Sequence, residues 1–378
     1  MDFTFTEEQQ AAVEAAKAVF AGVAPDGVPS PSLTAGAVAD DFDRALWARL
    51  ADGDLLSLLL DARYGGAGLD AVALCLVLRE SAKVLARVPL LESSAAALAV
   101  QTYGGAELKA DLLARAGRGE VVLTVAANGR TGHDGAELAV TARPEADAWV
   151  LDGVQTAVPW AQNADFVLVP ALSTGSGRSV LALVPRVHEG AVLAEQVSTT
   201  GERLGELRLD SVRIAARDVI DADGAWQWLR ELLATGTCAL ALGLGEGVLG
   251  MTSEYTSKRE QFGFPVATFQ AVAMQAADRY IDLRAMEATL WQAAWRISTS
   301  AGGALPASGD VAVAKIWASD GVRRVVQTAQ HLHGGFGADT DYPLHRYHAW
   351  AKHLELSLGP AAAHEEALGD LLAAHPLG

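Results

Sequence analysis

Apolar residues in the first 119 positions recur at intervals of three and four, which predicts amphipathic α-helices. The segments "DDFDRALWARLADGDLLSLLL" and "LDAVALCLVLRESAKVLA" follow this spacing, and the glycine-rich stretch "RYGGAGL" at 63–69 separates them. Thr6 followed by "EEQQ" is typical of a helix start with acidic side chains in the first turn. We therefore expect an N-terminal α-helical domain over residues 1–119.

The pattern changes between residues 120 and 220. Short runs rich in Val and Leu, such as "EVVLTVAA", "AWVLDGVQTAV" and "SVLALVP", follow one another and are separated by turn residues. This pattern of short apolar runs separated by turn residues is typical of antiparallel strands, so it predicts a middle β-domain over 120–220. Helical spacing then returns in long segments at 223–258, 266–300, 308–333 and 343–374, which predict a C-terminal four-helix bundle over 221–378.

Composition narrows the classes of partner. The chain has 46 acidic and 29 basic residues and a formal charge of −17. Nucleic acids and anionic membranes bind clustered Lys and Arg, so we expect neither as a partner. Cys75 and Cys238 lie in apolar helical contexts, which indicates no disulfide framework and fits a reducing compartment.

Nothing in the chain predicts targeting or insertion into a membrane. The first 20 residues carry acidic side chains where a signal peptide needs a basic and then an apolar run. The apolar segment 232–249 is interrupted by Thr, Gly and Glu246, which argues against a membrane span. We expect a soluble cytoplasmic protein.

The stretch "KREQFGFPVATFQAV" at 258–272 is the first candidate for ligand chemistry. A helix ends on a cationic side chain, a Phe–Gly–x–Pro turn follows, and the next helix opens with Phe269–Gln270. Arg259 at such a corner is able to hold a phosphate with two hydrogen bonds, and Phe262 offers an aromatic face. A solvated Arg at a helix C-terminus would have the same sequence, so this stretch alone does not show whether Arg259 binds a ligand.

The second candidate is "QHLHGGFG" at 330–337, which is followed by "DYPLHRY" at 341–347. Gly334–Gly335 lets the backbone approach a ligand and donate N–H groups, as diphosphate sites require. A plain helix C-cap also uses glycine. His331 and His333 have no carboxylate or Cys at ligand spacing, so we expect no metal site.

Together, after a helix–strand–helix plan, these stretches resemble the acyl-CoA dehydrogenases, flavoproteins that desaturate acyl-CoA thioesters between Cα and Cβ. The resemblance extends over essentially the whole chain, because "MDFTFTEEQQ", "RYGGAGL", "REQFGFPVATFQ" and "HLHGGFG…DYPLHRY" are similar to the family's opening, its "YGG-G" turn and its two C-terminal signatures. It implies an α+β fold with an N-terminal helical domain, a middle antiparallel β-domain and a C-terminal four-helix bundle. It also implies a tetramer in which FAD lies partly across a subunit interface.

The family's catalytic base is missing from the positions that the resemblance assigns. The reaction needs a carboxylate to remove the substrate α-proton while the flavin N5 accepts a β-hydride. Aligning "AKHLELSLGP" on the family's Glu–Gly–Thr motif places Leu358 at the Glu, Gly359 at the Gly and Pro360 at the Thr. In a minority of members the base lies on the first long helix of the bundle. That position falls on Leu233, and Glu231 stands two residues away, about 200° round the helix.

Residues that contact the flavin ring in the family are also changed. The Thr–Glu–Pro…Gly–Ser–Asp loop corresponds to "LTVAANGRTGHDGAEL", which keeps Thr124 and loses the other motif residues. The Trp–Ile–Thr that covers the ring and bonds N5 corresponds to Ala–Val–Pro at 157–159, and Trp160 comes three residues late. The hydroxyl that follows the base motif is replaced by Ala361–Ala362.

Another set of family residues is kept. In the family these residues reach across to the FAD of a neighbouring subunit and hold its adenine and diphosphate end. His331, which stands where a Gln is usual, can still make one hydrogen bond. The cofactor-binding residues that the resemblance implies are Arg259, Gln261, Phe262, Phe269, Gln270, His331, Gly334 and Gly335.

We therefore expect a base-less, non-catalytic subunit of a heterotetrameric (α2β2) acyl-CoA dehydrogenase, similar to those of actinobacterial sterol side-chain degradation. A catalytic sister subunit would supply the Glu and hold most of the FAD, an acyl-CoA would be the substrate, and an electron-transfer flavoprotein is the implied acceptor. Two alternatives stay open. One is a self-sufficient homotetramer with a displaced base, Glu231 or Glu355, and the other is a non-redox binding or structural protein with the same fold.

Overall fold

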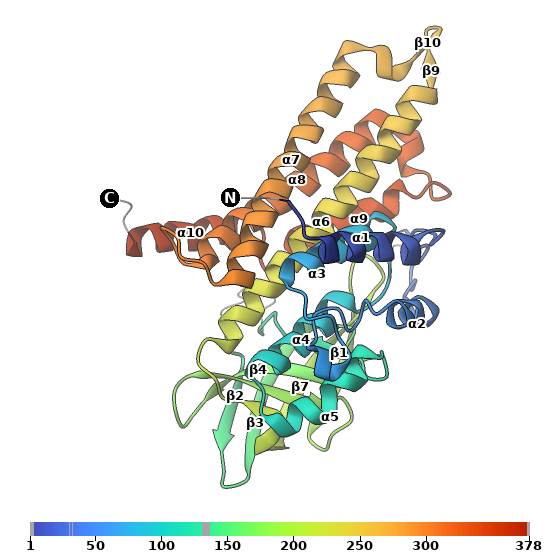
Figure 1. Ribbon diagram of the computed structural model, residues 1–378. Helices are drawn as coiled ribbons and strands as arrows, with labels where there is room; N and C mark the ends of the chain where they lie inside the picture. Colours follow the sequence, from blue (N-terminus) through green and yellow to red (C-terminus); the bar gives the residue numbers. More distant parts are fainter. Residues whose placement is uncertain (1–3, 30, 32, 131–136, 376–378) are drawn as a thin grey trace. The chain divides into compact units, whose positions relative to one another are not determined.

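The chain folds into two compact units, each assembled from separated stretches of sequence (Figure 1). The first unit contains Met1–Ala37, Cys75–Ala86 and Ala234–Gly378, and the second contains Val38–Leu74 and Arg87–Leu233. Two helices, α3 and α6, contribute residues to both units, and we describe each unit by itself. The structure, a computed structural model, describes residues 4–29, 31, 33–130 and 137–375.

The second unit contains the main sheet, and the order of its elements along the chain follows the predicted plan of helices, strands and helices. Asp43 caps α2 by accepting a hydrogen bond from the Leu46 N–H at 2.9 Å. In the "RYGGAGL" turn, a Cβ on Gly66 would lie 2.0 Å from the Leu60 carbonyl oxygen, so the turn requires glycine there. The helical segments of this unit are α2 (Arg44–Asp52), η1 (Ala62–Tyr64), the start of α3 (Ala71–Lys83), α4 (Leu90–Tyr103), α5 (Ala106–Gly117), η2 (Ala216–Asp218) and the start of α6 (Ala225–Lys258).

Among the described residues the sheet has eight strands, and it is mostly antiparallel. Its pairing order is β6-β7-β3-β2-β4-β5-β8, and β1 also pairs with β4. Two of the pairs, β1 with β4 and β2 with β4, are parallel, so the sheet is mixed. The strands are β1 (Leu123–Val125), β2 (Val140–Pro144), β3 (Ala148–Pro159), β4 (Phe166–Ser173), β5 (Ser179–Pro185), β6 (Ala191–Val197), β7 (Arg203–Ala215) and β8 (Val219–Ile220).

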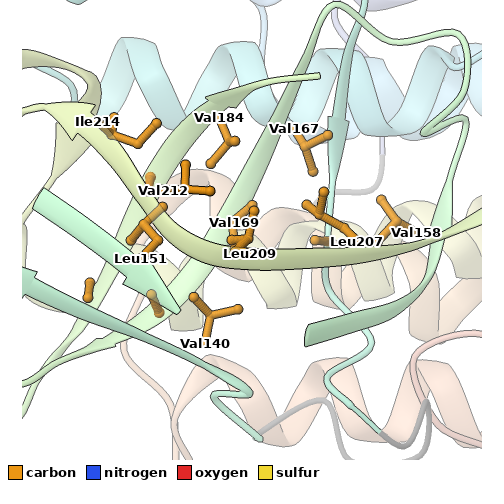
Figure 2. Packing of buried hydrophobic residues seen from close by; sticks show 14 of the residues in the cluster. Val140, Leu151, Val158, Val167, Val169, Val184, Leu207, Leu209, Val212 and Ile214 are labelled. Carbon is orange, nitrogen blue, oxygen red and sulfur yellow. The ribbon is translucent and has the colours of Figure 1, made fainter. Parts of the chain in front are cut away.

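One hydrophobic cluster forms the core of the sheet. The labelled side chains of β2, β3, β4, β5 and β7 lie together in it (Figure 2). Alternation along β7, where Leu207, Leu209 and Val212 are buried and their neighbours are more exposed, shows how strand periodicity builds this core. The short Val- and Leu-rich runs of the sequence therefore mark strands that bury one face or both.

The first unit is a helical bundle in which α8 packs against α7, α9 and α10 (Figure 1). Thr6 begins α1 through a capping box with Gln9, which confirms the predicted helix start. The elements of this unit are α1 (Glu7–Phe20), the rest of α3 and α6, β9 (Glu260–Gln261), β10 (Phe264–Pro265), η3 (Val266–Thr268), α7 (Gln270–Thr299), α8 (Ala307–His333), η4 (Gly334–Ala338), α9 (Leu344–Leu356) and α10 (Ala361–Ala374).

Alternating glycines in α6 allow close helix packing within this unit. A Cβ on Gly243 would lie 2.0 Å from the Arg79 carbonyl oxygen of α3, and a Cβ on Gly245 would lie 2.7 Å from the Leu283 side chain of α7. Glycine is unfavourable in a helix interior by about 1 kcal/mol relative to alanine, and close packing offsets that cost here. The interruptions of the apolar segment 232–249 are therefore contact positions.

Helix α6 is also the one helix among the described residues that is long and apolar enough to cross a membrane. Of its most apolar window, 78 % is buried within the protein. Its Glu246 forms ion pairs with Arg79 of α3 and, at 3.5 Å, with Lys83. This burial is the pattern of a core helix in a folded protein.

The segment predicted as one helix at 343–374 is two helices. α9 ends at Leu356 and α10 begins at Ala361. Between them, Leu358 has φ 57° and Gly359 has φ 99°, both outside the right-handed helical region. The Gly–Pro pair at 359–360 therefore breaks the helix, as glycine and proline after a helix end usually do.

Candidate cofactor-binding site

A two-residue hairpin at the end of α6 positions the first group of predicted cofactor residues. Phe262 and Gly263 form its turn with φ 55° and 81°, the conformation that a tight type I′ hairpin requires. The Phe262 side chain is 91 % exposed and contacts Phe269 edge to face at 6.4 Å between ring centroids. A non-glycine residue in this backbone region is strained, and among the described residues burial of the Phe262 ring does not offset that strain.

The polar side chains beside this hairpin face solvent, and the Gln261 amide donates to the Glu260 carbonyl at 2.8 Å. Arg259, Gln261 and Gln270 are exposed. Among the described residues Arg259 has no ion pair, whereas its neighbour Lys258 pairs with Glu254 at 2.5 Å. The backbone of Arg259 is fixed, because its N–H donates to the Tyr255 carbonyl at 2.8 Å and its carbonyl accepts from the Val266 N–H at 2.7 Å.

The double glycine forms an open loop after α8. Gly334 has φ 62° and ψ −141°, a conformation that favours glycine, and its N–H closes α8 by donating to the Gln330 and His331 carbonyls. A Cβ placed on Gly335 would meet no described atom within 4 Å, and its φ lies outside the positive range. Gly337 differs, since its Cβ would lie 2.9 Å from the His333 Cβ. Within the described chain, packing requires Gly337 but does not require Gly335.

The two histidines before this loop differ in environment. His331 is exposed, and His333 is buried. The His333 Nδ1–H donates to the Ala329 carbonyl at 2.8 Å, which leaves Nε2 to accept from the Tyr342 hydroxyl at 3.1 Å. Burial lowers the pKa of His333 and keeps this neutral tautomer. Among the described residues, no group of three or more His, Cys, Asp or Glu side chains is arranged to hold a metal ion.

The position assigned to the catalytic base lies in the break between α9 and α10. Leu358 is partly buried and Gly359 is buried. The Leu358 carbonyl lies 2.9 Å from Nε2 of His364. Leucine has no titratable group, so the Leu358 side chain cannot itself remove a proton. Leu233, the second position assigned to a base, is only 3 % exposed.

A buried lysine supports the same turn. Lys315 is fully buried, and its Nζ donates to the Ser319 hydroxyl at 2.9 Å and to the Leu354 and Glu355 carbonyls at 3.2 and 3.3 Å. These carbonyls belong to the last turn of α9, where a helix lacks internal partners and favours a cation. Burial lowers the pKa of Lys315 to about 8, although the Cys238 thiol and Glu355 favour its charged form.

The two acids that sequence reasoning offered as displaced bases are engaged in local contacts. Glu355 pairs with Lys352 at 2.6 Å and lies 3.8 Å from Arg323. Glu231 accepts a hydrogen bond from Gln227 at 2.7 Å.

The stretch assigned to the flavin ring has its polar groups occupied within the chain. The Thr124 hydroxyl donates to the Pro159 carbonyl at 2.6 Å. The Ala157 N–H donates to the Gln196 side-chain oxygen at 2.9 Å, and its carbonyl accepts from Asn128 at 2.9 Å. Pro159, at the place of the N5-bonding Thr, has no N–H and no hydroxyl. The rest of the corresponding loop, residues 131–136, lies outside the described residues.

Trp160 is held by a residue that sequence reasoning missed. Its indole N–H donates to Glu92 Oε2 at 3.1 Å, and its ring meets Phe42 edge to face at 6.3 Å. Burial raises the pKa of Glu92 to about 7, while its backbone N–H and Trp160 act in the opposite direction. A single Glu in the first turn of a helix is not a recognisable sequence motif. The contact between Glu92 and Trp160 is therefore visible only in the folded structure. Trp160 is thus bound within its own unit.

A cavity of about 430 Å³ lies at the other end of α7 and contains none of the predicted site residues. Arg296 and Asp310, which line it, pair with each other at 2.6 Å. The Arg296 guanidinium also donates to the Leu305 carbonyl at 2.8 Å. These contacts close the loop between α7 and α8 and indicate a structural role.

Comparisons with known proteins agree over the whole length of the chain. Residues 6–120 match the family model of the acyl-CoA dehydrogenase N-terminal domain, and residues 231–372 match that of the C-terminal domain. The acyl-CoA dehydrogenase FadE27 of Mycobacterium tuberculosis is 36 % identical over 382 residues, which covers 100 % of both chains. FadE28 of the same organism is 30 % identical over 345 residues, 90 % of this chain and 97 % of that one.

Solved structures show the same relation. The ChsE4–ChsE5 complex from Mycobacterium tuberculosis contains a chain that superposes with a TM-score of 0.90 at 34 % identity and covers 100 % of both chains. A variant of the Tcur3481–Tcur3483 steroid acyl-CoA dehydrogenase superposes with a TM-score of 0.88 at 36 % identity, covering 97 % of this chain and 98 % of that one.

Proposed function

This chain belongs to the acyl-CoA dehydrogenase family, and from that premise we propose that it is the base-less subunit of an α2β2 acyl-CoA dehydrogenase. In this proposal a catalytic sister subunit supplies the Glu base and most of the FAD site. This chain contributes contacts to the adenine and diphosphate end of that FAD.

The observation that carries the proposal is an asymmetry between two sets of residues. Groups at the flavin-ring positions bond within the chain, as Thr124 does to the Pro159 carbonyl. At the diphosphate positions the Arg259 guanidinium is exposed and has no ion pair among the described residues, and a Cβ on Gly335 would meet no described atom within 4 Å, although the Gly334 N–H closes α8. An exposed guanidinium beside an open glycine backbone fits an anionic diphosphate. The residues present therefore fit one end of FAD and do not fit its ring.

The role of the chain follows from what its residues can do. FAD, when bound, supplies the acceptor for a hydride from the substrate Cβ. Arg259 and the Gly334–Gly335 backbone would hold and orient the diphosphate, and Phe262 would cover an adjoining apolar surface. Leu358 has no titratable group, so in this proposal the base comes from the sister subunit.

The substrate, acceptor and compartment are further parts of the proposal. One relative of known structure is titled a steroid acyl-CoA dehydrogenase, and another is titled a complex of two named chains. This supports a sterol side-chain acyl-CoA as substrate and a heteromeric assembly. The family's usual chemistry supports an electron-transfer flavoprotein as acceptor, and two buried cysteine thiols fit the reducing cytoplasm.

Co-expression with a candidate sister gene tests the assembly. We expect the isolated chain to be colourless and the co-purified complex to contain one FAD for each pair of unlike chains, measured by native mass spectrometry and flavin absorbance. One FAD per chain in the isolated protein, together with oxidation of an acyl-CoA, would support the self-sufficient homotetramer instead. A chain that stays colourless with every sister candidate would support the non-redox alternative.

Two glycines of the same loop give a matched test of the cofactor contact. Gly335→Ala adds a Cβ that meets no described atom, so we expect unchanged or slightly raised stability of the isolated chain. In the complex, the same Cβ would face the diphosphate and weaken FAD binding about ten-fold or more.

Gly337→Ala is the control, because its Cβ would clash with His333 and Leu344. We expect this variant to lower the melting temperature of the isolated chain. If Gly335→Ala leaves the FAD dissociation constant of the complex unchanged, the loop does not contact the cofactor and the proposed role is wrong.

A further inference from the structure

The Gly334–Gly335 loop is flanked by two aromatic side chains that pack on a single ring. His333 precedes the glycines and Phe336 follows them. The Tyr255 ring stacks on His333 with 4.3 Å between centroids and 21° between planes, and on Phe336 with 5.4 Å and 11°. Offset, nearly parallel rings at these separations are favourable beyond the area that they bury. Both ends of an otherwise open glycine loop are thus held by one residue of α6.

The same residue also supports the other half of the candidate site. The Tyr255 carbonyl accepts the Arg259 N–H at 2.8 Å and so extends the helical turn into the hairpin. Arg259 stands four residues after Tyr255, one turn further along the helix direction. The Tyr255 side chain therefore holds the glycine loop in place, and the Tyr255 backbone carbonyl holds the Arg259 N–H at the start of the hairpin.

A second layer of contacts restricts the two flanking rings. Tyr342 lies 4.5 Å from Phe336 and 5.3 Å from His333 between ring centroids, and its hydroxyl donates to His333 Nε2. Phe336 is still 45 % exposed, so the fold does not depend on burying it. The Tyr255 hydroxyl lies 3.5 Å from the His333 carbonyl, at the limit of a hydrogen bond. Stacking of the rings, and not a hydrogen bond from this hydroxyl, is therefore the main contact between Tyr255 and the residues that flank the glycine loop.

We propose that Tyr255 is a positioning residue that sets the Gly334–Gly335 loop relative to the Arg259 corner, so that both can meet one diphosphate. This inference rests on the proposed function, because it assumes that the two halves serve the same FAD. A glycine loop has many accessible conformations, and a fixed one binds a ligand more tightly because less entropy is lost on binding.

The test compares Tyr255→Leu with Tyr255→Phe in the complex formed with the sister subunit. The FAD dissociation constant is measured by stripping the cofactor and titrating it back. We expect Tyr255→Leu to weaken FAD binding about ten-fold, because both stacked pairs are lost. Tyr255→Phe keeps both stacks and should bind within about two-fold of the native complex. Equal weakening in both variants would overturn the stacking account.

Two further variants keep the test decisive if Tyr255→Leu folds poorly. Phe336→Leu removes one of the two stacks at an exposed position and should weaken FAD in the same direction. Trp291→Leu removes a different aromatic contact of the bundle, the one with Phe5 at 5.1 Å, and should lower stability without changing FAD affinity. A merely structural role of Tyr255 would make its variants behave like Trp291→Leu.

Arg259→Ala separates this inference from the proposed function. If Arg259→Ala weakens FAD binding and the Tyr255 and Phe336 variants do not, the positioning role is wrong and the proposed function stands. If Arg259→Ala has no effect, the proposed function itself fails.

Hydrogen exchange on the isolated chain gives a readout that needs no cofactor. Amides of the segment from Gly334 to Phe336 should exchange faster in Tyr255→Leu than in Tyr255→Phe, and equal rates would contradict the inference.

Discussion

At the scale of single residues, the same amino acid can bind a ligand or pack within the fold. Its neighbours in space determine which of the two it does. Thr124 matches a cofactor-contacting residue of the family, yet its hydroxyl is bound to the Pro159 carbonyl. Gly335 and Gly337 are two positions apart, and only the second is required by contacts within the described chain. Sequence reasoning identified both kinds of position and could not separate them, because hydrogen-bond partners and steric neighbours come from distant segments.

Gln155 is a residue that no sequence pattern marked. It is fully buried on β3, opposite Leu207 of β7, and neither polar atom of its side-chain amide has a hydrogen-bond partner among the described residues. Directly opposed residues share one face of the sheet, so this amide lies on the core side. An unsatisfied buried polar group is unfavourable by about 1–3 kcal/mol.

We predict that Gln155→Met, which keeps the volume and removes the amide, raises the free energy of unfolding by about 1 kcal/mol. Urea denaturation with a constant m-value measures it. Gln196→Met is the matched control, because Gln196 bonds Thr156 and the Ala157 N–H, and its loss should destabilise the protein. A destabilising effect of Gln155→Met would mean that the amide has a bound partner.

At the scale of elements, the end of α9 shows how packing decides a boundary. The sequence predicted one helix over 343–374, and the structure has two, separated by Leu358 and Gly359 in positive φ. The Gly–Pro pair explains why the chain turns. Lys315, which lies 39 residues before Leu354 in sequence, donates to the last carbonyls of α9. This cap could not be predicted, because a Lys in an amphipathic helix usually points to solvent.

Helix α9 also contains a histidine, His353, whose burial predicts that the free energy of unfolding depends on pH. Burial, with a smaller effect from Lys315, lowers the pKa of His353 from its ordinary value of 6.5 to about 4. Between these values the unfolded chain binds a proton that the folded chain does not, so the group contributes stability above pH 6.5 that is lost as pH falls toward 4. The change amounts to roughly 2–3 kcal/mol over that window.

His353→Gln should therefore flatten the decline of unfolding free energy between pH 6.5 and 4, measured by denaturant titration at several pH values. His375→Gln, at an exposed position near the end of α10, controls for the loss of a histidine. Parallel profiles for the His353 variant and the native chain would show that His353 is not the titrating group.

At the scale of the whole molecule, the proposed function is divided between two unlike chains. The family and the α+β fold predicted from sequence are confirmed by the comparisons. The three-domain boundaries stay a prediction, because the contact pattern groups the chain into two units that each combine distant segments. In the proposed function, one such chain has a usable diphosphate end and no usable ring end, so two unlike chains are needed for one site.

The proposed division of the site between two chains predicts what happens when a carboxylate is introduced at the base position of this chain. Leu358→Glu places a carboxylate at the family's usual position, yet Pro159 offers no donor to a flavin and Ala157 is bonded to Gln196 and Asn128. We expect no anaerobic flavin reduction by acyl-CoA in the isolated variant, even with added FAD. In the complex, the same variant should not rescue a sister subunit whose Glu base is replaced by Gln. Rescue would show that this chain contains a working active site.

The sequence by itself determined the order of helices and strands, the motifs that resemble the family, and the two leucines that stand where this resemblance would place a base. These follow from local periodicity, from turn residues and from the identity of single side chains, none of which requires a neighbour. The tertiary structure alone decided that Thr124 and Ala157 are bonded internally, that Trp160 is held by Glu92, and that Tyr255 joins the Arg259 corner to the glycine loop. The physical reason is that hydrogen bonds and stacking depend on which distant side chains the fold brings within a few ångströms.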